Sequence, residues 1–123
     1  MDRQTLYDHI NNEYRVSPEY PWRRYPANAV FRHKDNRKWF ALIMTVGRDK
    51  LGFDNREPVD VVNLKIDDMF FRDIIIQEEG IMPAYHMNKL HWITVLLDGT
   101  VLDERVYDLL DISYTATASP KKM

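Results

Sequence analysis

The chain has 123 residues, 17 basic and 19 acidic side chains, no cysteine and a formal net charge of −2. This length predicts one domain over residues 1–123. The absence of cysteine excludes thiolate catalysis, cysteine-bound zinc, iron–sulfur clusters and disulfides. Hydrophobic residues at 45% exclude the collagen-like and disordered classes.

The N-terminal segment predicts one helix followed by a stiff connection. Apolar side chains recur there at helical spacing, at Leu6, Tyr7, Ile10 and Tyr14. This helix is expected to end near Val16, because Ser17-Pro18 bars its continuation. Residues 17–28 hold three prolines and three aromatic side chains, which are Tyr20, Trp22 and Tyr25. We expect this stretch to be irregular and packed on the domain.

Three strands are predicted next, over Ala29–His33, Lys38–Val46 and Val59–Ile66. The second of them is apolar on both faces, which is typical of a strand in the middle of a sheet. A tight polar turn at residues 34–37 joins the first two, and a longer polar loop at residues 47–58 joins the second and third.

The C-terminal half predicts two helices and one more strand. Asp67 or Asp68 is expected to cap a helix that ends before Gly80. Its predicted buried stripe is Met69, Phe70, Ile74 and Ile75. Residues 81–90 are expected to be irregular and residues 91–97 to form a strand. The last helix is predicted to begin at Asp103, as the N-cap, and to bury Val106, Leu109, Leu110 and Ser113.

This order of elements predicts an α+β fold, a mainly antiparallel sheet of four to five strands with three helices. Alternating strand directions place the 47–58 and 78–90 loops at one end of the sheet. The 34–37 turn is then expected at the other end, nearly 30 Å away along the second strand.

The positive charge is concentrated in one part of the chain. Residues 23–50 carry eight basic and two acidic side chains, a net charge of +6 within an acidic protein. A solvated hairpin explains this block, and so does an anion-binding surface.

Enzyme signatures are missing from the sequence. It has no dinucleotide-binding or phosphate-binding glycine motif and no serine in a nucleophile elbow. His86 and His91 are five residues apart, which does not fit a metal-binding pair on one helix face. We therefore expect no catalytic residue, no metal site and no cofactor, and we expect that the protein is not an enzyme.

The most distinctive stretch is residues 84–92, AYHMNKLHW, at a junction of loop and strand. Its cation, amide, imidazoles and indole suit phosphate contacts and base stacking. Each group also has a structural interpretation, since Trp92 fits core packing and Lys89 fits an ordinary solvated surface.

The HMNKLHW string resembles the MmcQ/YjbR family. The Trp39-Phe40-Ala41 segment, the stretch from Gly80 to Tyr85, and the final helix with Asp111 to Tyr114 are similar to that family as well. The resemblance covers residues 2–117. It implies a small α+β domain like bacterial frataxin and a label of DNA binding through a double-wing arrangement. The positions that match the family's element are Asn88, Lys89, His91 and Trp92.

The leading hypothesis is therefore a non-enzymatic binding domain that contacts DNA through loops at one end of the sheet. Arg48, Lys50 and Lys89 are expected to contact phosphates, Asn88 and His91 to donate hydrogen bonds, and Trp92 to stack or to support the loop.

The alternative is a protein-interaction or chaperone-like adaptor that uses Tyr20, Trp22 and Tyr25 as anchors. A third possibility, a small-molecule enzyme, requires a concave pocket with converging polar groups near His86 or His91.

The expected location and assembly follow from what the sequence lacks. No apolar run approaches the ~18 residues of a membrane span, and the polar N-terminus lacks the apolar segment of a secretory signal. We expect no membrane contact, a cytoplasmic location and a monomer.

Overall fold

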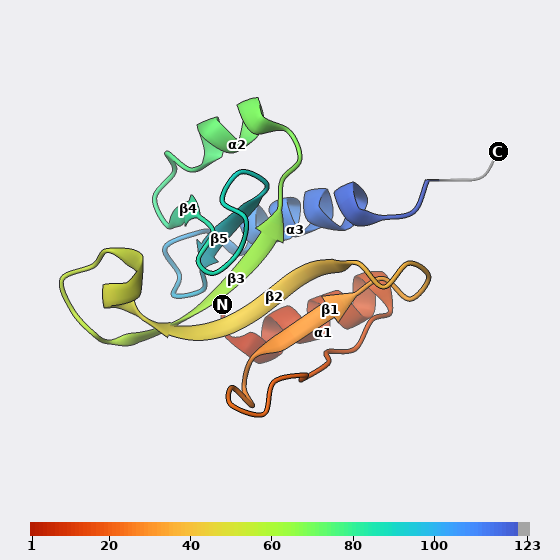
Figure 1. The fold of residues 1–123 in the computed structure, drawn as a ribbon, viewed down its shortest axis with the longest axis horizontal. Coiled ribbons are helices and arrows are strands. Elements are labelled where there is room, and N and C mark those ends of the chain that lie inside the picture. Colours follow the sequence, from red (N-terminus) through yellow and green to blue (C-terminus); the bar gives the residue numbers. More distant parts are fainter. Residues whose placement is uncertain (121–123) are drawn as a thin grey trace.

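A computed structural model describes residues 1–120 and shows one five-stranded antiparallel sheet with three helices (Figure 1). The strand order is β1-β2-β3-β5-β4. The strands are β1 (Ala29–Arg32), β2 (Trp39–Gly47), β3 (Pro58–Lys65), β4 (Ile81–Pro83) and β5 (Trp92–Leu96). The helices are α1 (Arg3–Tyr14), α2 (Met69–Ile75) and α3 (Asp103–Thr117), with a short 3₁₀ turn η1 (Arg48–Leu51) after β2. The predicted α+β class is confirmed.

Strand β2 is the long central strand that its apolar pattern predicts. It pairs with β1 on one side and with β3 on the other, and five consecutive side chains, Phe40 to Met44, are buried. Because side chains alternate between the two faces of a strand, a run of this kind requires cover on both faces.

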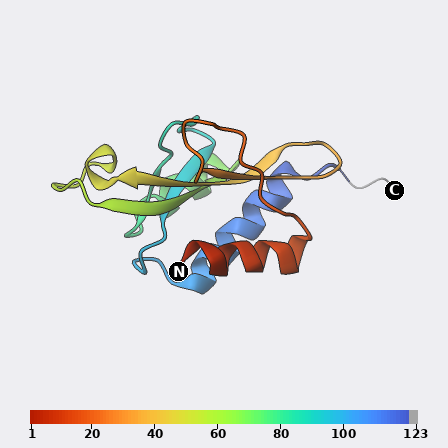
Figure 2. The same ribbon diagram turned by 90° about the horizontal axis from the view of Figure 1, so that it is seen from below.

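Helices α1 and α3 cover one face of the sheet and enclose the main core (Figure 2). The four predicted buried residues of α3 are confirmed as Val106, Leu109, Leu110 and Ser113. The N-cap of α3 is Leu102 rather than Asp103, which lies in the first turn of the helix. A carboxylate in that turn still interacts favourably with the positive end of the helix dipole.

Within residues 1–120, no helix lies on the opposite face of the sheet. Figure 2 shows two irregular segments on that side: residues 17–28, here called the arm, and residues 84–91, here called the crossing loop. A second apolar cluster lies beneath them and is formed by Val30, Leu42, Met44, Val59, Val61 and Leu96. The arm is tied to the sheet edge by an antiparallel bridge between Glu19 and Val30.

The predicted placement of the loops is wrong in one respect. Strand β5 runs antiparallel to β3, with Lys65 opposite Trp92, so the crossing loop starts from the same end of the sheet as the 34–37 turn. The reason is β4, which was expected to be irregular. This strand reverses the chain once more by pairing Ile81 with Val95 and Pro83 with Ile93.

The predicted buried stripe of α2 is also wrong. Met69, Phe70 and Ile74 are 47%, 85% and 67% exposed, and only Ile75 is buried. The helix has seven residues and projects beyond the sheet, so it can turn only one short stripe toward the core (Figure 1). Its predicted cap is confirmed, since the Asp68 side chain accepts hydrogen bonds from the second and third residues of the helix.

Gly80 lies four residues beyond the helix C-cap, not directly after it, and serves the turn into β4. Its φ of +87° favours glycine, and a Cβ there would lie 2.7 Å from the side chain of Val101. Within residues 1–120, we find no helix that combines the length and the hydropathy needed to cross a bilayer.

Candidate functional site

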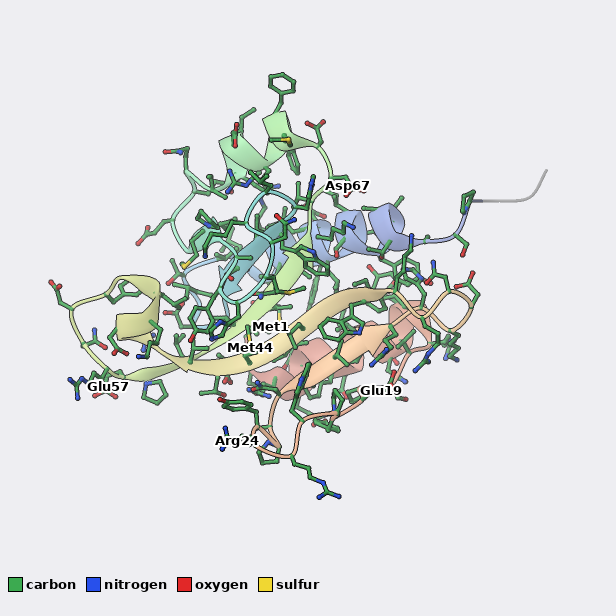
Figure 3. All side chains as sticks on the ribbon, viewed as in Figure 1. Met1, Glu19, Arg24, Met44, Glu57 and Asp67 are labelled. Atoms are coloured by element: carbon green, nitrogen blue, oxygen red, sulfur yellow. The ribbon has the colours of Figure 1, made fainter. Side chains whose placement is uncertain are left out.

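All three tryptophans of the chain meet at one place on the helix-free face of the sheet. Trp22 comes from the arm, Trp39 from the start of β2 and Trp92 from the start of β5, and all three line a cavity of about 480 Å³. Leu42 and Met44 of β2 line the same cavity from the sheet. We call this feature the tryptophan groove. In Figure 3, Met44 lies on β2, and Arg24 lies at the turn of the arm.

The arm side of the groove is built by aromatic packing. The rings of Trp22 and Trp39 are nearly perpendicular, at 89°, with their centroids 5.6 Å apart. The guanidinium of Arg32 lies 5.6 Å from the centroid of the Trp39 ring, within the range of a cation–π contact. Arg32 is also held by Glu19 of the arm at 3.4 Å. These contacts fix the arm against the sheet.

The groove continues along β2 toward η1. A second cavity of about 290 Å³ shares Tyr25, Asn28, Met44 and His86 with the first and extends to Lys50. The two cavities therefore form one channel between the arm and the crossing loop, with β2 as its floor.

A buried polar cluster holds the crossing loop over the sheet. Asn63 of β3 and Thr94 of β5 are neighbours in register on the helix-free face and are fully buried. The Thr94 hydroxyl donates to the Asn63 side-chain oxygen at 2.6 Å, and the Asn63 amide donates to the Tyr85 carbonyl at 2.9 Å. The Tyr85 N–H in turn donates to the Thr94 hydroxyl oxygen at 2.9 Å. Every polar atom of this cluster thus helps to fix the start of the loop.

Backbone strain marks the next position of the crossing loop. His86 has φ +60°, a left-handed conformation that is uncommon for residues other than glycine. Its ring lies 3.9 Å from the ring of Tyr85, and it lines both cavities of the groove. Strained residues of this kind persist where the surrounding structure fixes them, and they cluster at functional sites.

The predicted element from Asn88 to Trp92 lies at the end of the crossing loop. Asn88 is exposed, and its side-chain oxygen accepts from the Leu90 N–H at 2.9 Å, so it also shapes the turn. Lys89 is exposed, and its ammonium donates to the Ala84 carbonyl at 2.7 Å. His91 is half-buried, and its Nδ1 has no hydrogen-bond partner among the described residues.

The two cations predicted from the 47–58 loop have different surroundings. Arg48 is bound to Asp98 at 2.9 Å and to the Pro58 carbonyl. Burial opposes the charge of Asp98, but hydrogen bonds from Thr100 and Arg48 outweigh it and hold the pKa of this carboxyl below its usual range. Arg48 is thus committed to an internal ion pair.

Lys50, in contrast, lines a further cavity of about 330 Å³ together with Lys89. The structure therefore brings these two lysines to one cavity, although η1 and the crossing loop start at opposite ends of the sheet. This happens because the crossing loop folds back over the sheet face.

Positive charge is concentrated in the segments that build the groove. Residues 17–47 and 81–97 carry seven basic and two acidic side chains, net +5, while the rest of the chain is net −7. None of the described residues that line the three cavities is an aspartate or glutamate. An anionic ligand would therefore meet no carboxylate on the groove walls.

Of the residues that line the channel, Lys50, Asn88 and Trp92 were predicted as a DNA-binding site. Trp22 and Tyr25 were expected to be protein-interaction anchors, and Trp39 was interpreted only as part of a central strand. The signal in the sequence was the set of aromatic residues on three separate segments, but nothing in their spacing shows that they converge.

The structure and sequence match known proteins over most of the chain. The family model described as YjbR matches residues 13–116. The protein is 38% identical over 117 residues to the uncharacterised protein YyaQ of Bacillus subtilis, covering 95% of this chain and 98% of that protein. A segment of 38 residues is 47% identical to the uncharacterised protein YjbR of Escherichia coli, covering 31% of this chain and 32% of that protein.

Solved structures agree with these matches. A crystal structure of a Pseudomonas syringae protein superposes with a TM-score of 0.92 at 41% identity, covering 96% of this chain and all of that one. A crystal structure of the Deinococcus radiodurans protein DR2400, with domain DUF419, superposes with a TM-score of 0.68 at 26% identity, covering 92% of this chain and 75% of that one. The relatives from B. subtilis and E. coli carry no named activity. By fold and by sequence, this chain belongs to the YjbR family.

Proposed function

We propose that this protein is a non-enzymatic DNA-binding domain whose ligand lies in the tryptophan groove. The observation that carries the proposal is the convergence of all three tryptophans on one channel, whose lining among residues 1–120 holds no carboxylate. Aromatic side chains bind DNA by stacking on bases, and lysines bind it by neutralising phosphates.

The roles of the predicted residues follow from their surroundings. Lys50 and Lys89 supply the phosphate contacts, because Arg48 is occupied by Asp98. Asn88 offers a polar group at the end of the groove, and Trp92 forms part of its wall. His91 does not line the groove, so the hydrogen-bonding role expected for it is not part of this proposal.

The composition of the groove favours binding over catalysis. Its lining is mainly aromatic and aliphatic, and its titratable side chains are Lys50, Tyr25, Tyr85 and His86. General acid–base catalysis by a histidine usually involves a partner that orients the ring, and none of the lining residues is a carboxylate that could do so.

Salt dependence tests the phosphate contacts. Lys50 and Lys89 are each expected to neutralise one phosphate. The slope of the logarithm of the binding constant against the logarithm of salt concentration should then be about −1.8 for duplex DNA and about −1.4 for single strands. Replacing Lys50 with alanine should reduce the size of the slope by about 0.7 to 0.9. The control is Arg56→Ala, in the same loop and exposed, which should leave the slope unchanged.

The titration follows the anisotropy of labelled oligonucleotides at low ionic strength. If neither duplex nor single-stranded DNA shows salt-dependent binding, the proposed function is wrong. If Arg56→Ala and Lys50→Ala lower the slope equally, binding does not use the groove.

A protein-interaction domain is the second candidate. Tyr20 and Tyr25 of the arm are 53% and 60% exposed, and the exposed face of α2 adds Phe70. Exposed aromatics of this kind are common at interfaces. Trp22, the third expected anchor, is half-buried against Trp39 and belongs to the groove.

A further inference from the structure

The shape of the tryptophan groove discriminates between forms of DNA. In a duplex each base is stacked on its neighbours, so only base edges and phosphates face the protein. A base can stack on an aromatic side chain only when it is unpaired and turned away from its neighbours. Aromatic rings recessed between two loops are therefore a platform for a single strand.

Of the perpendicular pair Trp22 and Trp39, Trp22 is the ring better placed for such stacking. In a perpendicular pair of rings, the edge of one ring points at one face of the other, so Trp39 covers at most one face of Trp22. The Arg32 guanidinium lies over Trp39 and leaves that ring the less available of the two. Trp22 is half-buried and lines the groove.

Tyr25 offers a second platform three residues along the arm. Its side chain is 60% exposed and lines both cavities of the channel. The two rings therefore flank the path that leads from Trp39 toward Lys50.

The cations lie where the phosphates of such a strand would pass. Lys50 lines the far cavity of the channel, and Lys89 shares the neighbouring cavity with it. The floor of the channel follows β2, whose nine residues span roughly 26–30 Å. This length suits a short site of about four nucleotides, the low end of the range for single-strand grooves.

We propose that the tryptophan groove binds a short segment of single-stranded DNA, with bases stacked on Trp22 and Tyr25 and phosphates near Lys50 and Lys89. This rests on the proposed function and narrows it from DNA in general to the unpaired form. Stacking tolerates any base, so the groove is expected to have little sequence preference.

The test compares a labelled twelve-residue oligothymidylate with a duplex of equal length at low salt. The single strand should bind at least tenfold more tightly than the duplex. Trp22→Leu should weaken single-strand binding by roughly five- to a hundredfold, the loss of one stacked base. Tyr20→Leu is the matched control, because Tyr20 is exposed on the same arm, does not line the groove and should leave affinity unchanged.

A second variant separates a loss of stacking from a loss of the fold. Tyr25 is exposed, so Tyr25→Ser is expected to keep the fold, and its single-strand affinity should also fall severalfold.

The outcomes separate this inference from the broader function. Duplex binding as tight as single-strand binding overturns the single-strand inference but leaves DNA binding in place. Single-strand binding that neither Trp22→Leu nor Tyr25→Ser weakens overturns the stacking geometry. Absence of binding to both forms overturns the inference and the proposed function together.

Discussion

Replacing Asn63 with alanine is expected to lower the free energy of unfolding by about 2–4 kcal/mol, because buried polar groups lose their partners. The Tyr85 carbonyl would lose its donor, and the Thr94 hydroxyl would lose its acceptor. Asn63 is fully buried beneath the crossing loop, so little water can replace these hydrogen bonds. Urea unfolding measures the loss.

The same substitution should loosen the groove wall before the whole domain unfolds. Tyr85 donates its N–H to Thr94, and hydrogen exchange at that amide is expected to accelerate in the variant. Asn12→Ala is the control, because Asn12 is exposed on α1, and its effect should stay within about 0.5 kcal/mol. An Asn63 variant as stable as this control would show that the cluster does not hold the loop.

The largest loss of stability is expected from Phe40→Ala, about 3–5 kcal/mol. Phe40 is fully buried and contacts aromatic rings from three elements. Its ring centroid lies 5.7 Å from Tyr14 of α1, 4.9 Å from Tyr114 of α3 and 6.2 Å from Phe31 of β1. Truncation removes the group that joins both helices to the first hairpin and leaves a cavity.

Phe70→Ala is the matched control for this loss. The Phe70 side chain is 85% exposed, so removing it should change the unfolding free energy by less than about 0.5 kcal/mol. Thermal or urea unfolding distinguishes the two variants. Equal losses of unfolding free energy in the two variants would contradict the role of Phe40 as a core residue that joins the helices to the sheet.

Local sequence patterns correctly predicted the elements in which an apolar run or a helical spacing of apolar residues marks the buried face. The apolar run in β2 and the helical spacing of Val106, Leu109 and Leu110 in α3 correspond to the observed core. The Asp68 cap is equally local, because it needs only a short acceptor before the first turn of a helix.

Features that depend on long-range pairing could not be predicted from those signals. Strand β4 has three residues and includes Pro83, too little for a strand pattern, yet it reverses the direction of β5. The apolar residues Phe70 and Ile74 have the spacing of a buried face, but α2 lies where no second layer covers them. Hydrophobic spacing indicates which side chains share a face and not whether that face is covered.

The candidate site shows the same division. The crossing loop was singled out by its composition, and the structure places Asn88 and Trp92 on the groove. The contribution of Trp22 and Trp39 depends on how the arm folds over β2, which no local pattern encodes. The commitment of Arg48 to Asp98 likewise joins residues fifty positions apart.

The measurement that tests the groove most directly is an NMR titration that follows the indole N–H signals of Trp22, Trp39 and Trp92. These three signals are the full set of tryptophan side chains, and all come from the groove. On addition of whichever DNA form binds more tightly, all three are expected to shift and to saturate together. Saturable binding that leaves all three unmoved, with shifts confined to the polar turn at residues 34–37, would contradict the assignment of the groove as the ligand site.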